Sequence, residues 1–190
     1  MDSSLSLLKT RRSTPSRLLI EPGPTDAQLR ELIEAAARVP DHGLLKPWRL
    51  LLVRQSEGRI LGESVVAMCD ARGDQIDASA REKDRHRFDR APLMLVLISS
   101  PTPGHKVPQI EQFASAAALA QNILLAAHAM GFGAQWLTGW PAYDRDVFEL
   151  LGLGVNESIV GFMHLGTASA VIPDLPRPSF TDIVQEWSAT

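Results

Sequence analysis

Four short, largely apolar runs most strongly restrict what this chain can fold into. They cover Trp48 to Val53, Leu93 to Ser99, Gly133 to Thr138 and Ile159 to Leu165. Runs of this length suit buried β-strands, and they fall well short of the length that a membrane-spanning helix needs. The sequence therefore predicts a globular fold built around a sheet, and no membrane partner.

The clearest helix signals lie between the first residues and the first apolar run. Thr25 is followed three residues later by Gln28, which is the pattern of a capping box. Apolar side chains then recur on one helical face, at Leu29, Leu32, Ile33 and Ala36. Pro40 ends this helix, because the residue before a proline is pushed out of helical geometry.

Further helices are expected over residues 2–10, 57–71, 111–130 and 144–151. The helix over 111–130 is the longest, and Gly131 suits its C-terminal cap. Its many alanines allow another helix to approach closely, so we expect it to lie centrally and to be available for packing against a partner subunit. The tail from Ile172 to Pro178 holds three prolines, which predicts an extended arm rather than a regular strand or helix.

Helices and strands alternate along the chain, and this order alone favours a doubly wound α/β sheet. Such sheets usually bind nucleotides at a glycine-rich first turn. The sequence contains neither a G-x-G-x-x-G pattern nor a Walker A pattern. A bound nucleotide would therefore have to be held by side chains.

The composition is that of an ordinary globular protein. The 190 residues are 45% hydrophobic and 22% charged, with a net charge of -3, which suits one domain over 1–190 and gives no sign of a nucleic-acid surface. Cys69 is the single cysteine, so no internal disulfide can form. The first residues lack the apolar stretch of a secretory signal, and a cytoplasmic location is expected.

Some segments carry two interpretations. The heavily charged stretch from Asp70 to Arg90 is either a solvated surface or a mobile flap over a pocket. The histidines are scattered without metal-ligand spacing, and we expect no metal site. There is no G-x-S-x-G motif for a serine nucleophile, and Cys69 in a helical stretch is expected to be a packed thiol.

The candidate binding residues fall in three places. Arg11, Arg12 and Ser13 together can grip a phosphate or an electron-rich heterocycle, although adjacent surface arginines are more often only solvated. His42 follows a turn that can present polar groups to a pocket, but a lone histidine is more often structural. The glycine-rich stretch 131–139 fits either turn chemistry or a backbone that passes close to a flat ligand.

Taken in order, these segments resemble the FMN-dependent nitroreductase family, in particular its branch of small members. The resemblance rests on RRS at 11–13, EPGPT at 21–25, AARVPDHGLLKPWRLLLV at 36–53, RAP at 90–92, HKVPQIEQ at 105–112, GFGAQWLTG at 131–139 and IVGFMHLGT at 159–167. Each piece is short, but their joint order and spacing are specific. The resemblance covers nearly the whole chain.

The resemblance implies a different fold from the one that element order favours. It implies an α+β, nitroreductase-like fold with a central, mostly antiparallel sheet wrapped by helices. It also implies an intertwined homodimer whose flavin sites lie at the subunit interface. The C-terminal arm, at about 170–190, would reach over the partner subunit.

The resemblance also assigns roles to residues. Arg11, Arg12 and Ser13 match the flavin-binding start, where one arginine neutralises the FMN phosphate and another faces the pyrimidine edge of the ring. Arg38 and His42 match positions that contact FMN from the partner subunit. The remaining matches are Trp136, Leu137 and Thr138 beside the ring, where backbone N–H groups can reach N5 or O4, and Arg177 at the phosphate.

Two departures from the family pattern stand out. Leu137 replaces an arginine that is usual in this branch, which would make the pocket more apolar if the side chain reaches the substrate. An insertion-like difference follows Ser13, so the resemblance gives Arg17 no role.

The implied activity is hydride transfer from NAD(P)H to flavin N5, and then to a small organic acceptor such as a nitroaromatic compound or a quinone. The two substrates would share one site in ping-pong order, and no catalytic side chain would be required. The alternatives are reductive dehalogenation, enone reduction or flavin breakdown on the same fold, and a flavin-binding module without turnover.

Overall fold

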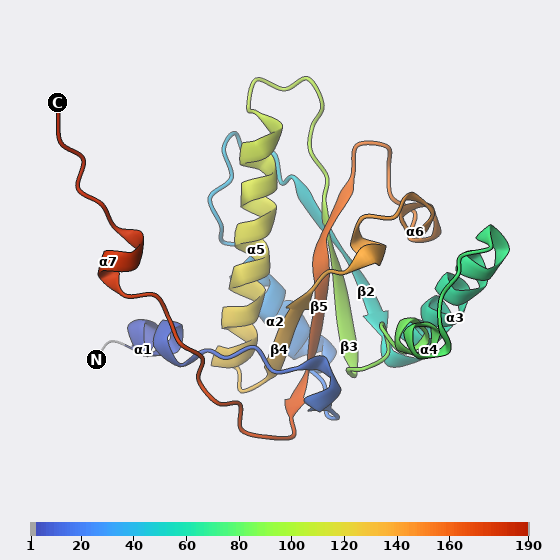
Figure 1. Ribbon diagram of the computed structural model, residues 1–190. Coiled ribbons are helices and arrows are strands. Elements are labelled where there is room, and N and C mark those ends of the chain that lie inside the picture. Colours follow the sequence, from blue (N-terminus) through green and yellow to red (C-terminus); the bar gives the residue numbers. More distant parts are fainter. Residues whose placement is uncertain (1–2, 190) are drawn as a thin grey trace.

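An antiparallel sheet forms the centre of the computed structural model, which describes residues 3–189 (Figure 1). The strands run in the order β1-β5-β3-β2, and β4 also pairs with β5. Their bounds are β1 Leu19–Ile20, β2 Trp48–Arg54, β3 Leu93–Ser99, β4 Gly133–Leu137 and β5 Ser158–Ala168. All of these pairs are antiparallel, so the fold is α+β, as the family resemblance implied.

The doubly wound sheet that element order favoured is therefore wrong. β2 is followed by two helices before β3, yet β3 returns antiparallel beside it, from Trp48 opposite Ser99 to Arg54 opposite Leu93. A helical connection supplies enough chain for either direction of return. The alternation of helices and strands therefore does not determine strand direction.

Helices cover both faces of the sheet (Figure 1). Residues of α2 (Asp26–Ala36) and α5 (Gln109–Ala129) pack on one face with Leu95 and Leu97. Residues of α3 (Gln55–Arg72) and α6 (Arg145–Leu150) pack on the other face with Met94 and Val96. Successive side chains of a strand point to opposite faces, and β3 is buried throughout because each face has its own apolar layer.

The predicted capping box at the start of α2 is confirmed. The Thr25 hydroxyl accepts from the Gln28 backbone N–H, and the Gln28 side chain accepts from the Thr25 backbone N–H. The helix ends at Ala36, before the expected stop at Pro40. β5 is longer than expected, because Gly166 continues the strand opposite Gly133 instead of closing it.

The charged segment 70–90 packs against α3, although much of its surface is solvated. α4 (Ala78–Arg85) and the turn after it lie against α3, as Figure 1 shows. A Cβ atom on Gly58 would overlap the Phe88 carbonyl, and one on Gly62 would overlap the Arg85 carbonyl. These two glycines lie one helical turn apart and let the backbone of 85–89 rest directly on α3.

The N-terminal helix lies beside the segment that follows β5 (Figure 1). α1 (Ser3–Thr10) is crossed by the segment that follows β5, and this segment continues to the short helix α7 (Phe180–Ile183). Residues 173–189 are exposed, including large apolar side chains at Leu175, Phe180 and Trp187. Among the described residues, no helix has the length and apolarity that crossing a membrane requires.

Candidate functional site

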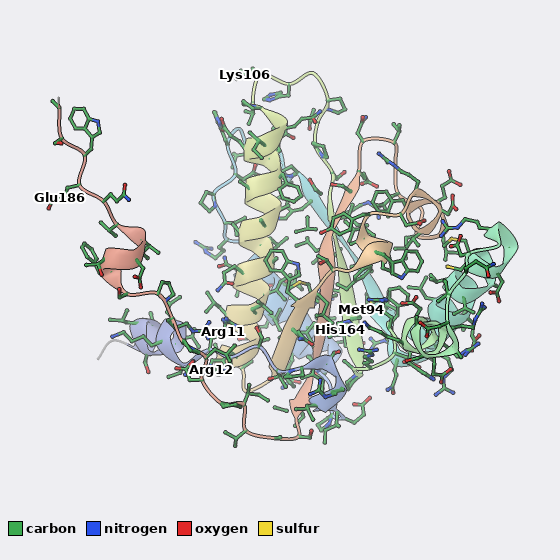
Figure 2. The ribbon with its side chains drawn as sticks, viewed as in Figure 1. Arg11, Arg12, Met94, Lys106, His164 and Glu186 are labelled. Atoms are coloured by element: carbon green, nitrogen blue, oxygen red, sulfur yellow. The ribbon has the colours of Figure 1, made fainter. Side chains whose placement is uncertain are left out.

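Arg11, Arg12 and Arg177 meet at one pocket, although Arg177 is far from the other two in sequence. The pocket has a volume of about 400 Å³ and is lined by Leu8, Lys9, Arg11, Arg12, Gln121 and Arg177. Its walls come from α1, from the segment after α1, from α5 and from the C-terminal tail. Figure 2 shows Arg11 and Arg12 beside α1, next to the crossing tail.

The segment that carries the two arginines is held at both ends. The Arg11 backbone N–H donates to the Leu7 carbonyl over 3.0 Å and so extends the last turn of α1. Three residues later, the Thr14 N–H donates to the Ala134 carbonyl of β4, also over 3.0 Å. Arg11 to Ser13 therefore lies between α1 and β4, and Ser13 Oγ accepts from Arg11 Nη1 over 3.3 Å.

The pocket has an excess of positive charge. Asp174 lies 2.6 Å from Arg12 Nη2 and 3.5 Å from Arg177 Nη2, so one carboxylate serves two guanidinium groups. Arg11 has no ion-pair partner within residues 3–189. Burial, followed by the positive charges of Arg177 and Arg12, lowers the pKa of Arg11 below its ordinary value. Such a site favours an anion that can accept several hydrogen bonds.

β4 leads away from this region toward Leu137 and Thr138, which are half-buried. Its first residue, Gly133, lies against the Thr14 side chain, and four further residues of strand extend about 13 Å. The Trp136 side chain packs against β5. Its indole Nε1 donates to the Val160 carbonyl over 3.0 Å, and the indole ring covers Gly161. A ligand beside this segment would therefore meet the Trp136 backbone or the two residues after it.

The structure does not bring His42 to the arginine pocket of the same chain. His42 Nδ1 lies 2.8 Å from Glu111 Oε2, in the first turn of α5. Gln121, which lines the pocket, is ten residues further along α5, or about 15 Å. Figure 2 agrees, since Lys106, just before α5, lies at the opposite end of the molecule from Arg11 and Arg12.

Arg38 lies beside α5 at the level of Gln121, because its contact residue Asn122 follows Gln121 directly. Its carbonyl accepts from Asn122 Nδ2 over 3.4 Å, near the middle of α5. Lys9, Gln121 and Asp174 belong to the pocket or to its ion pairs, and sequence reasoning did not select them. Lys9 precedes two arginines and could have been found from that basic run, but nothing local distinguishes Gln121 or Asp174.

His164 is the one buried histidine among the described residues. It lies on β5, is 1% exposed, and its Nδ1 has no hydrogen-bond partner. Figure 2 shows it on the strand next to Met94, its partner on β3. Burial, followed by the charges of Arg90 and Arg87, lowers its pKa to about 4. Within residues 3–189, no cluster of three or more metal-ligating side chains occurs.

Solved structures with the same fold span almost the full chain. A "Nitroreductase-like Family Protein" from Bacillus cereus has a TM-score of 0.83 at 24% identity, covering 100% of this chain and 98% of that one. A "putative nitroreductase in complex with fmn" from Desulfovibrio desulfuricans has a TM-score of 0.75 at 20% identity, covering 100% and 99%. At these identities the likeness shows the fold.

Sequence relatives extend the likeness beyond the fold. The "Putative NAD(P)H nitroreductase YdjA" of Escherichia coli K12 is 36% identical over 184 residues, which is 94% of this chain and 98% of that protein. A "Putative NAD(P)H nitroreductase" of Haemophilus influenzae is 30% identical over 165 residues, covering 86% and 88%. The family model described as "Nitroreductase family" matches residues 8–167. This chain therefore belongs to the Nitroreductase family.

Proposed function

We propose that this protein is an FMN-dependent oxidoreductase that passes reducing equivalents from NAD(P)H to a small organic acceptor, such as a nitroaromatic compound or a quinone. The observation that carries the proposal is the meeting of Arg11, Arg12 and Arg177 at one pocket of a Nitroreductase-family chain. Bound FMN would supply the redox chemistry, by accepting a hydride and passing it on. The name of the Desulfovibrio protein includes FMN, and that of the Escherichia protein includes NAD(P)H. These names support FMN as the cofactor and NAD(P)H as the co-substrate.

The arginine pocket fits the phosphate of FMN. A phosphate offers three acceptor oxygens and negative charge, and Arg11 offers guanidinium donors that no carboxylate occupies within residues 3–189. Burial lowers the pKa of Arg11 first and the charges of Arg177 and Arg12 lower it further, and binding an anion there would offset both effects. Arg12 and Arg177 already share Asp174, so they would contribute less new charge.

The ring end of the cofactor is proposed to lie along Trp136, Leu137 and Thr138. β4 connects this segment with the region of the arginine pocket over about 13 Å. Because the Trp136 indole is bonded to Val160, the contacts to the ring would come from backbone N–H groups and from the Leu137 side chain. No side chain in this arrangement has to act as a catalytic acid or base.

The proposal includes a homodimer. His42 and Arg11 lie near different ends of α5, so a site that uses both must combine two chains. The exposed apolar side chains of the tail support this, since Phe180 is 74% and Trp187 88% exposed. Large apolar groups gathered on one segment usually mark an interface. The segment 170–190 is accordingly proposed as an arm over the partner subunit.

Titration of the purified protein with FMN, followed by quenching of flavin fluorescence, tests the cofactor. Arg11→Ala should weaken FMN binding about ten- to a hundredfold, because a charge-assisted contact contributes roughly 1.5–3 kcal/mol. Arg11→Lys should also lose affinity, since an ammonium lacks the planar fork. Arg59→Ala is the matched control, because this arginine lies on α3 with its side chain 73% exposed. Failure of the wild-type protein to bind FMN would refute the assignment.

Light scattering tests the dimer. The wild-type protein should behave as a dimer, and the double variant Phe180→Ser/Trp187→Ser should dissociate at a higher concentration because apolar area is lost from the arm. A monodisperse monomer that still binds FMN tightly would contradict the two-chain site.

Oxidation of NADH or NADPH with a nitroaromatic compound or a quinone separates an enzyme from a flavin-binding module without turnover. Reduced acceptor should accumulate as the nicotinamide absorbance falls. A screen that includes halogenated aromatics, enones and free reduced flavin separates nitroreduction from dehalogenation, enone reduction and flavin breakdown.

A further inference from the structure

A buried three-residue cluster lies behind the turn that follows β4. Asp84 Oδ1 accepts from Arg87 Nε over 3.0 Å and from Arg87 Nη2 over 2.5 Å. Asp84 Oδ2 accepts from the indole Nε1 of Trp140 over 3.0 Å. The Asp84 side chain is only 7% exposed and that of Arg87 only 17%. One oxygen of this buried carboxylate therefore holds Arg87 in the turn after α4, and the other joins α4 to the segment after β4.

The cluster is held in place by α3. The backbone of 85–89 rests on Gly58 and Gly62, where a side chain would overlap it. Phe88, within the same stretch, is fully buried and packs edge-on against Phe162 of β5. Asp84 and Arg87 therefore flank or lie within a stretch that packs against both α3 and β5. The hydrogen bond from Trp140 to Asp84 fixes the position of Trp140 relative to this stretch.

The turn itself is built to sit against Arg87. Gly139 has φ 92° and ψ -179°, a conformation that is essentially restricted to glycine. A Cβ atom at this position would lie 2.8 Å from Arg87 Nη1. The guanidinium therefore packs directly on the Gly139 backbone, while its other nitrogens bind Asp84. Trp140 then begins the short 3-10 helix Trp140–Ala142.

We infer that Asp84, Arg87 and Trp140 are positioning residues for the flavin ring. They fix the backbone of Thr138 and Gly139, which directly continues the segment proposed to contact the ring, so this inference rests on the proposed function. The charged segment 70–90 thereby gains a role: it is the support for the ring-binding turn. A buried carboxylate with two strong partners suits this task, because its geometry is narrowly defined.

Two variants test the inference, each by weakening one contact of Asp84. Trp140→Phe removes the indole N–H that reaches Asp84. Asp84→Asn keeps the shape of the side chain but removes its charge from the pair with Arg87. The measurements are the FMN dissociation constant and the visible circular dichroism of bound FMN, which reports the asymmetry of the ring's surroundings. Thermal unfolding of each protein reports the structural effect separately.

Each variant has a matched control elsewhere in the chain. Trp48→Phe removes an indole whose Nε1 is buried without a hydrogen-bond partner, so it loses similar bulk but no hydrogen bond. Glu157→Gln weakens the bidentate pair with Arg49, whose distances of 2.7 and 2.6 Å resemble those of the Asp84 pair. That pair joins β2 to the turn before β5, away from Gly139.

We expect Trp140→Phe and Asp84→Asn to raise the FMN dissociation constant about tenfold and to change the visible dichroism. The controls should leave FMN affinity within about twofold and the visible dichroism unchanged, even where they lower the unfolding temperature. Wild-type affinity and dichroism in both Trp140→Phe and Asp84→Asn would overturn the inference and leave the proposed function intact. A wild-type protein that binds no FMN would overturn both.

Discussion

The indole of Trp136 covers Gly161 on the neighbouring strand, and a Cβ atom at Gly161 would overlap Trp136 Nε1. That nitrogen donates to the Val160 carbonyl over 3.0 Å, so the side chain reaches across from β4 to β5. The residue that sequence resemblance places beside the flavin ring is therefore also a structural clamp between two strands. Its contribution to a ligand site has to come from its backbone.

This clamp predicts the effect of Gly161→Ala. The added methyl group should displace the indole and break its hydrogen bond, which overpacks the site and lowers the free energy of unfolding by about 1–3 kcal/mol. Because Leu137 and Thr138 follow Trp136 directly, FMN affinity should fall as well. Denaturant unfolding and FMN titration measure the two effects. Gly154→Ala is the control, since a Cβ there meets only ordinary contacts; equal stabilities of the two variants would contradict the clamp.

The packing of α4 on α3 predicts that Gly58→Ala and Gly62→Ala each destabilise the fold. Alanine is the better helix former by about 1 kcal/mol, so an exposed glycine in a helix would gain stability from the change. Here the new methyl group meets a backbone carbonyl that cannot rotate away, and we expect a net loss of about 1–3 kcal/mol. A gain in the unfolding free energy of either variant would show that the 85–89 segment lies loosely on α3.

His164 predicts a pH dependence of stability. Its pKa is about 4 in the folded protein, against an ordinary value near 6.5 when the chain unfolds. Between these values the unfolded state binds the proton and the folded state does not, so stability should fall as the pH drops from about 6.5 to 4. The loss is at most about 3.5 kcal/mol, because each tenfold difference in proton affinity between the two states corresponds to roughly 1.4 kcal/mol.

The variant His164→Met removes this group while keeping a buried side chain of similar size. Its unfolding free energy should depend less on pH between 4 and 6.5 than that of the wild-type protein, since only the carboxylates and other histidines still titrate. Parallel pH profiles of the two proteins would mean that His164 titrates normally in the fold.

Steady-state kinetics test how NAD(P)H and the acceptor share the proposed site. If one open flavin face serves both, double-reciprocal plots at several acceptor concentrations should be parallel, and each substrate at high concentration should inhibit competitively against the other. Converging lines would indicate two separate sites.

The Cys69→Ala variant should keep the parallel pattern. Cys69 is 2% exposed, and burial raises the pKa of its thiol, so it is neither reachable nor ionised near neutral pH. A Cys69→Ala protein that folds and binds FMN but has lost turnover would contradict a mechanism in which the flavin alone carries the hydride.

Part of the candidate site could be predicted from the sequence, and part could not. Arg11 and Arg12 were found because they are adjacent, and the resemblance added Arg177, which the structure brings to the same pocket. Asp84 was missed because it lies among many exposed charges between Asp70 and Arg90. Only its burial and its two partners distinguish it, and both depend on residues that are distant in the chain, such as Trp140.

The sequence by itself determined the local elements of this protein. Thr25 with Gln28 starts α2, Gly131 ends α5 with φ 82°, and the apolar runs form strands, because each signal acts within a few residues. Only the tertiary structure decided that the strands are antiparallel, that Gly166 lies inside β5, and that Arg87 packs behind Gly139. These relationships join distant segments, and they arise when two apolar layers close on the sheet and the backbone approaches itself where glycine leaves room.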